Sequence, residues 1–297
     1  MSALLGNPMV TTAALPLALG TVMALLARVA LPGSVLSLLW AALILFFYWD
    51  TLGPPVVPPV AASQKLIYLA SGGIVVGLLP ERLLSAAVAG KLVAAALAVA
   101  LLWLGWRRLA GGSLDLQMVA ALIAGLLAIV GAAMLLSARS SPSSSAEAPF
   151  LVPAAMLAFC LAGAIISVLG ASIVTGQLLG SLAALAGGWC LVQYITVLRG
   201  GSAVAWSKGT ELLLIYAAAT VQIQVALLAP KANPVALVLS SLPLIVAMLM
   251  PGPLRGLVPG VRPLRPPIAG LLIATPAILA ILTAILWAPH GAALGFS

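Results

Sequence analysis

Residues 171–198 read ASIVTGQLLGSLAALAGGWCLVQYITVL and contain no charged side chain. This run exceeds the ~20 predominantly apolar residues that an α-helix needs to cross the ~30 Å hydrocarbon core of a bilayer. Apolar runs of similar character recur along nearly the whole chain. The pattern predicts an all-α fold, a polytopic bundle of transmembrane helices in contact with the lipid bilayer.

The composition leaves no room for a soluble domain. Of the 297 residues, 64% are hydrophobic and only 6% are charged, whereas about a quarter of an ordinary soluble domain is charged. We therefore treat residues 1–297 as a single integral membrane domain. The first apolar run lacks a basic leader and a clear cleavage site, so we expect it to stay as a helix and not to be removed as a signal peptide.

The chain is divided near its middle by a short polar linker at 139–149, rich in serine. It separates a first helix group, 1–138, from a second, 150–297. We predict about ten spans, with eight or nine as the alternative because the third and ninth runs are short. The predicted helices are 8–27, 32–49, 65–80, 83–105, 115–138, 150–169, 171–198, 210–229, 235–250 and 268–288.

A proline-rich stretch, PPVVPP at 54–59, connects the second and third predicted helices. Such a sequence favours polyproline II, which is stiff and has no internal hydrogen bonds. Trp49 before it and Lys65 and Tyr68 after it suit the headgroup boundary of a membrane. We interpret the stretch as a strap between two helix ends, with a docking ribbon for an outer partner as the alternative.

The basic residues indicate how the bundle is oriented. The net charge is +8, but the Lys and Arg residues are scattered between apolar runs, which does not favour nucleic-acid binding. If the N-terminus is outside, eight of them lie on the cytoplasmic side and four outside, with Lys91 inside a helix. This bias predicts that both termini are outside, in what we expect to be a bacterial inner membrane. The outer four are Lys65, Arg107, Arg108 and Lys231.

The seventh predicted helix carries small residues at every fourth position, including a GxxxG pair. Small residues at this spacing form a groove in which a second helix approaches closely. We predict that the ridge is a helix-packing seam inside the bundle. The alternative is a seam with a second copy of this chain or with another membrane protein. The ridge comprises Ser172, Gly176, Gly180, Ala184 and Gly188.

Polar residues inside the apolar runs form a candidate pathway. Tyr216, Thr220 and Gln224 are spaced by four and therefore share one face of the eighth predicted helix. An amide that faces lipid is costly, so these groups should face protein or water. Lys91 is the one charge well inside an apolar run, and Gln193 flanks the small-residue ridge. The alternatives are hydrogen bonds between helices and, for Lys91, a side chain that extends back to water.

Catalytic and metal chemistry lack a sequence signal. Neither the acids nor the serines form a catalytic arrangement, and His290 and the cysteines Cys160 and Cys190 form no cluster. We therefore expect no enzyme activity, no metal and no cofactor. An outer acid, Asp50, keeps open an enzyme acting on lipid-linked substrates. The favoured function is a permease-like carrier of a small solute, and the alternative is a non-catalytic scaffold or accessory subunit of a membrane complex.

Overall fold

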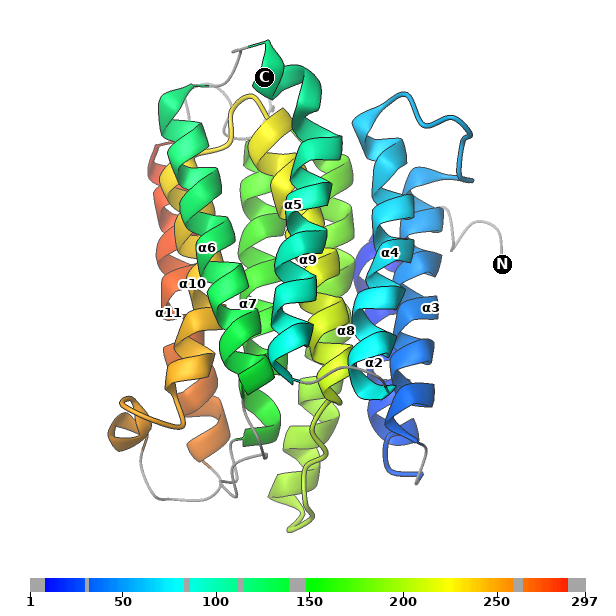
Figure 1. Ribbon diagram of the computed structural model, residues 1–297. Coiled ribbons are helices and arrows are strands. Elements are labelled where there is room, and N and C mark those ends of the chain that lie inside the picture. The colour runs from blue at the N-terminus through cyan, green and yellow to red at the C-terminus, as the bar shows by residue number, and fades with distance from the viewer. Residues whose placement is uncertain are drawn as a thin grey trace.

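The computed structural model describes residues 9–29, 32–82, 86–111, 115–138, 148–258 and 264–287, and within them it contains helices and no strands. A helix stands at each predicted place, so the all-helical prediction is confirmed. The helices form an upright bundle (Figure 1). They are a π-helical turn η1 (Val10–Ala14), α2 (Leu15–Leu26), α3 (Gly33–Leu52), α4 (Ala62–Arg82), α5 (Ala86–Ala110), α6 (Leu116–Ala138), α7 (Ala148–Leu169), α8 (Ile173–Leu198), α9 (Lys208–Leu228), α10 (Pro234–Leu249), a short 3-10 turn η2 (Arg255–Leu257) and α11 (Arg265–Leu286).

Seven of these helices are long and apolar enough to cross a membrane, so the predicted span count of about ten is not confirmed. Three more are apolar but shorter: Val10–Leu26, Ala62–Leu78 and Pro234–Leu249. At ~1.5 Å per residue, a helix of the length of α10 falls short of the ~30 Å hydrocarbon core. The seven qualifying helices are α3, α5, α6, α7, α8, α9 and α11.

Local sequence signals set several of the helix ends. Gly53 follows α3 with a φ of 79°, a left-handed conformation that costs glycine little. The Ser207 hydroxyl accepts the backbone N–H of Thr210 and caps the start of α9. At the start of α10, the Asn233 side chain accepts two backbone N–H groups, and Pro234 occupies the first helical position. Capping and proline thus turn apolar runs into helices with defined beginnings.

The helices alternate in direction along the chain. In Figure 1, α3, α5, α7, α9 and α11 run upward, and α2, α4, α6, α8 and α10 run downward. We call the two ends of the bundle the upper and lower ends accordingly. The predicted linker at 139–149 lies almost entirely outside the described residues, but the two helix groups that it separates are interleaved. Helix α2 packs on α8, α4 and α5 pack on α9, and α6 packs on α10.

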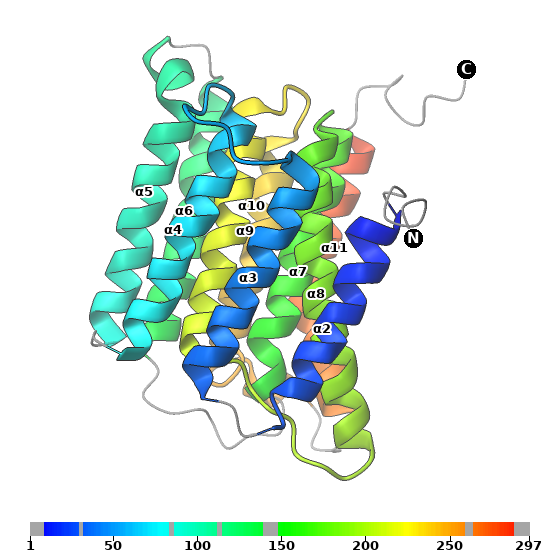
Figure 2. The ribbon, with the colours of Figure 1, turned by 90° about the vertical axis from the view of Figure 1, so that its right-hand side faces the viewer.

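Helix α9 occupies the centre of the bundle (Figure 2). It contacts α3, α4, α5, α6, α7, α8 and α10, and every residue from Gly209 to Leu227 is buried. A helix enclosed in this way exposes no side to lipid. Every polar side chain between Gly209 and Leu227 is therefore surrounded by protein.

The small-residue ridge on α8 packs against the chain itself. A methyl group added at Gly176 would lie 2.7 Å from a Val168 methyl of α7. At Gly188 it would overlap the backbone oxygen of Leu17 in α2, and at Gly20 of α2 it would overlap the backbone oxygen of Leu185 in α8. The α2 and α8 backbones therefore touch at two reciprocal glycines, which favours the intramolecular seam. Gly180 and Ala184 are half-buried, and Ser172 is the residue before α8.

Two glycines of the ridge give a matched test of this packing. Gly188→Ala should lower the free energy of unfolding in detergent by about 1–3 kcal/mol, because the backbones of α2 and α8 must separate. Gly180→Ala should change it much less, since the added methyl group would lie 4.0 Å from its nearest neighbour, the Thr12 oxygen. Equal effects of the two substitutions on thermal unfolding would contradict the close contact between α2 and α8.

Candidate functional site

The predicted polar face of α9 lies inside the bundle. Tyr216, Thr220 and Gln224 are 2%, 0% and 6% exposed. The Thr220 hydroxyl donates to the backbone oxygen of Ala217 at 2.7 Å, and the Tyr48 hydroxyl of α3 donates to the same oxygen at 3.1 Å. One carbonyl of the central helix thus accepts two hydrogen bonds, and the second of them joins α3 to α9.

Two glycines of α4 make room for Tyr216. A methyl group added at Gly73 would lie 2.9 Å from the Tyr216 ring, and one at Gly72 would lie 3.8 Å from its hydroxyl. A side chain at Gly73 would therefore collide with the Tyr216 ring unless the ring or α4 moved, whereas a methyl group at Gly72 would make an ordinary contact. The adjacent glycines in an otherwise apolar run were a sequence signal for this contact, but the sequence gives no indication of which helix they face.

Gln222 points to a different side of α9 and bonds to α10. Its Nε2 donates to the Ser240 hydroxyl at 2.8 Å, and that hydroxyl donates to the Leu237 backbone oxygen at 2.8 Å. The amide oxygen of Gln222 is buried without a hydrogen-bond partner among the described residues. The oxygen lies against Gly163 of α7, and the Gln222 side chain also lines a gap of about 20 Å³ between α6, α9 and α10, which is room for about one water molecule.

Gln224 repeats this feature on the predicted polar face. Its amide oxygen is also buried and has no hydrogen-bond partner within the described part of the chain. Leaving a buried acceptor unsatisfied costs about 1–3 kcal/mol. The central helix therefore carries two amide oxygens that can each accept a hydrogen bond from a solute or a water molecule.

The structure places the other two predicted pathway residues elsewhere. Lys91 is exposed in the second turn of α5 and does not share the buried face of α9. Gln193 is buried in α8, where its amide oxygen accepts the backbone N–H of Val204 at 2.9 Å. Gln193 thus holds the connection between α8 and α9, residues 199–207. Three of the five predicted residues share a helix face.

Sequence reasoning missed an aromatic cluster at the lower end of the bundle. The cluster consists of Trp40 of α3, Trp189 of α8 and Trp206 of the α8–α9 connection, and all three rings are buried. Their ring centroids are 5.3–5.9 Å apart, and the rings are tilted or edge-on to one another. The three positions are distant in sequence, so only the fold brings them together.

Hydroxyl groups fix the connection beside this cluster. Ser37 of α3 lies 2.8 Å from the Ser207 hydroxyl and 3.0 Å from the Thr210 hydroxyl. Ser207 in turn donates to Thr210 at 3.1 Å. The buried Trp206 ring and these three hydroxyls clamp the α8–α9 connection against α3, which closes the lower end of the bundle at this point.

The described residues hold no group of three or more His, Cys, Asp or Glu side chains that could bind a metal ion. Asp50 is exposed near the end of α3, and Cys160 and Cys190 are free thiols. In comparisons with known proteins, no family model matches the chain, and neither a curated protein nor a solved structure matches it.

The two partners Gln222 and Ser240 test the energetics of the buried amides. Ser240→Ala should destabilise the protein by about 1–3 kcal/mol, because it removes the hydroxyl to which the buried Gln222 amide donates. Gln222→Met removes the whole amide at similar volume and should cost less than about 1.5 kcal/mol or stabilise the fold. The free energies of unfolding of both variants in detergent provide the measurement.

The double variant supplies the control. In the Gln222→Met background, Ser240→Ala should cost less than it does alone, since no buried amide remains to lose its partner. Additive effects of the two substitutions would contradict the coupling between α9 and α10 through this hydrogen bond.

Proposed function

We propose that this multi-pass membrane protein is a permease-like carrier of a small, neutral or weakly polar solute, and that α9 forms the inner wall of its path. The observation that carries the proposal is the buried, unpartnered amide oxygen of Gln224, which shares one face of the central helix with Tyr216 and Thr220. Hydrogen bonds between membrane helices contribute only ~0.6 kcal/mol on average. Stability alone is therefore a weak reason to keep a glutamine on this face, whereas a solute with an N–H or O–H group would donate to its amide oxygen.

Carrying requires the bundle to open, because α9 is enclosed on all sides in the present conformation. Alternating access is achieved by moving one group of helices against another around a central site. The tryptophan cluster and the Ser37–Ser207–Thr210 hydroxyls close the lower end. We infer that the α8–α9 connection separates from α3 when that end opens. The proposal assigns the protein no catalytic step.

The orientation of the carrier is part of the proposal. With the upper end of Figure 1 outside, both termini are outside and the connection at 199–207 is cytoplasmic. The eight-to-four distribution of Lys and Arg supports this arrangement in a bacterial inner membrane. A reporter enzyme that is active only outside the cytoplasm should accordingly be active when it is fused to either terminus. Cytoplasmic reporter activity at the termini would contradict the orientation.

A second candidate function, that of a non-catalytic scaffold or accessory subunit of a membrane complex, is favoured by a different observation. An apolar groove of about 450 Å³ lies between α7, α8 and α11, and Pro266, Pro267 and Gly270 help to line it. A transmembrane helix of another protein could occupy such a groove. In this role the glutamines of α9 would contribute only to packing.

Access of water to α9 distinguishes the two functions. In a background in which Cys160 and Cys190 are replaced by Ala, cysteine is placed at Thr220, at Gln224 and, as a control, at Ala218. Ala218 is also buried but lies ~200° away from Thr220 around the helix. A carrier that opens should allow a membrane-impermeant thiol reagent to label positions 220 and 224 much faster than 218.

Protection of all three positions over hours in native membranes would contradict the carrier and favour the scaffold. Equal labelling of all three would show that the substitutions loosen the bundle. In that case a second series of single-cysteine variants is needed, in which whichever of Thr220 and Gln224 does not carry the cysteine is replaced by Ser. A path again requires positions 220 and 224 to react faster than position 218.

A further inference from the structure

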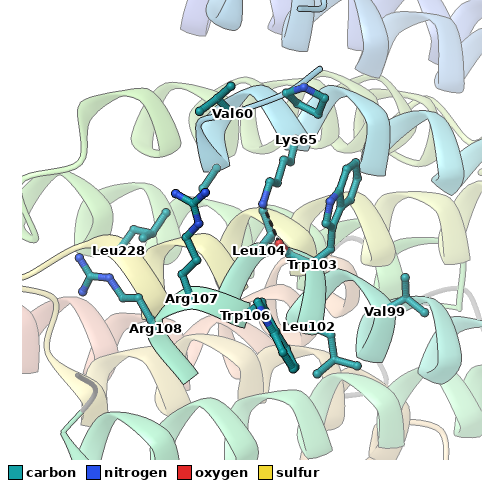
Figure 3. A pocket seen from close by; sticks show the side chains of 12 residues that line it. Val60, Lys65, Val99, Leu102, Trp103, Leu104, Trp106, Arg107, Arg108 and Leu228 are labelled. Atoms are coloured by element: carbon teal, nitrogen blue, oxygen red, sulfur yellow. Dashed lines mark hydrogen bonds between the residues drawn. The ribbon is translucent and has the colours of Figure 1, made fainter. Parts of the chain in front are cut away.

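A groove with a volume of about 860 Å³ lies at the upper end of the bundle, within the range of sites that bind small molecules. It is formed where the strap that joins α3 to α4 passes the beginning of α4 and the end of α5 (Figure 3). The Tyr68 hydroxyl donates to the Val56 oxygen at 2.8 Å, and the Gln64 amide oxygen accepts the N–H groups of Val60 and Ala61. These bonds hold the strap in place as one wall of the groove.

Among the residues that the structure describes, three cations line this groove and no acid does. Lys65 is fixed by α5: its ammonium group donates to the Trp103 oxygen at 2.9 Å and lies 5.8 Å from the centre of the Trp103 ring. Arg107 and Arg108 are exposed in the last turn of α5 and have no hydrogen bond or ion pair with any residue that the structure describes. Figure 3 shows Lys65 and Arg107 extending toward the same space from opposite walls.

The side chains below the cations are suited to lipid. Trp103 and Trp106 are exposed on α5, and tryptophan is enriched at the boundary between headgroups and acyl chains. Val99 and Leu102, further into the membrane on the same helix, are exposed apolar residues of the groove. The groove therefore presents positive charge at headgroup level and an apolar surface at acyl-chain level.

We propose that this groove binds an anionic phospholipid. The phosphate lies between Lys65 and Arg107, with Arg108 beside it, and the acyl chains run along Val99 and Leu102. Arginine suits this role because its planar guanidinium donates to two phosphate oxygens at once. A favourable interaction with the helix dipole explains basic residues at the end of α5, but it does not explain Lys65 on α4 or the concave shape between them.

Native mass spectrometry of the protein with added phosphatidylglycerol or phosphatidylcholine of the same acyl chains tests the proposal. The wild type should retain phosphatidylglycerol in preference to phosphatidylcholine. In Arg107→Gln/Arg108→Gln the affinity for phosphatidylglycerol should fall by about tenfold or more, as expected for the loss of charge-assisted hydrogen bonds. Arg255→Gln is the control, because Arg255 is an exposed arginine in η2, between the end of α10 and the beginning of α11. Both of these helix ends lie at the lower end of the bundle (Figure 1).

Three outcomes would overturn the proposal. The first is equal retention of the two lipids by the wild type. The second is an equal loss of affinity for phosphatidylglycerol in the double variant and in Arg255→Gln. The third is displacement of the lipid by millimolar inorganic phosphate. The last result would assign the groove to a free phosphate-bearing ligand. Melting temperatures without lipid show whether the variants fold, and the single Arg107→Gln variant provides the same comparison where the double variant is not recovered.

Discussion

The structure depends on the enclosure of α9. A helix in lipid satisfies its own backbone hydrogen bonds, but its polar side chains need partners that hydrocarbon does not offer. Because Gly209–Leu227 is buried throughout, hydrogen-bond partners for α9 have to come from the neighbouring helices. Tyr48 joins α3 to it through the Ala217 oxygen, and Ser240 joins α10 to it through Gln222. The positions of α3 and α10 are thus specified by hydrogen bonds to one central element, while α2 and α11 pack on helices outside it.

Glycines allow this enclosure. Apolar association gives helices little reason to pack tightly when the surrounding lipid is as apolar as they are, so close van der Waals contact has to supply the energy. Gly73 of α4 admits the Tyr216 ring, and Gly163 of α7 admits the amide oxygen of Gln222, to which an added methyl group would come within 2.9 Å. The reciprocal Gly20 and Gly188 do the same for α2 and α8. Large polar groups on α9 and small residues on its neighbours are therefore two parts of one packing arrangement.

The sequence predicts the helices well and their partners poorly. Apolar runs, glycine breaks and capping residues are local signals, so the predicted helix at 210–229 falls close to the observed Lys208–Leu228. The spacing of Tyr216, Thr220 and Gln224 predicts a shared face, because helix geometry is regular. By contrast, the grouping of Trp40, Trp189 and Trp206 depends on which helices lie side by side, and no local pattern encodes this. For the same reason Lys91 and Gln193, which resembled the α9 residues in sequence, lie in different surroundings.

The proposed lipid site affects how the outer Lys and Arg residues are interpreted as evidence for the orientation of the protein. A count of loop charges treats each Lys and Arg as a signal for the cytoplasmic side. Of the four outer cations, Lys65, Arg107 and Arg108 line one groove, and Lys231 is outside that lining. Cations that bind a lipid headgroup can lie on either side of the membrane, because either leaflet can supply the lipid. Such cations are therefore weak evidence for the orientation of the chain. Once these three are set aside, one outer cation remains against the eight that the predicted orientation assigns to the cytoplasmic side, so lipid binding in the groove is compatible with external termini. If the groove binds a lipid headgroup, Arg107 and Arg108 are explained by that binding and do not argue against external termini.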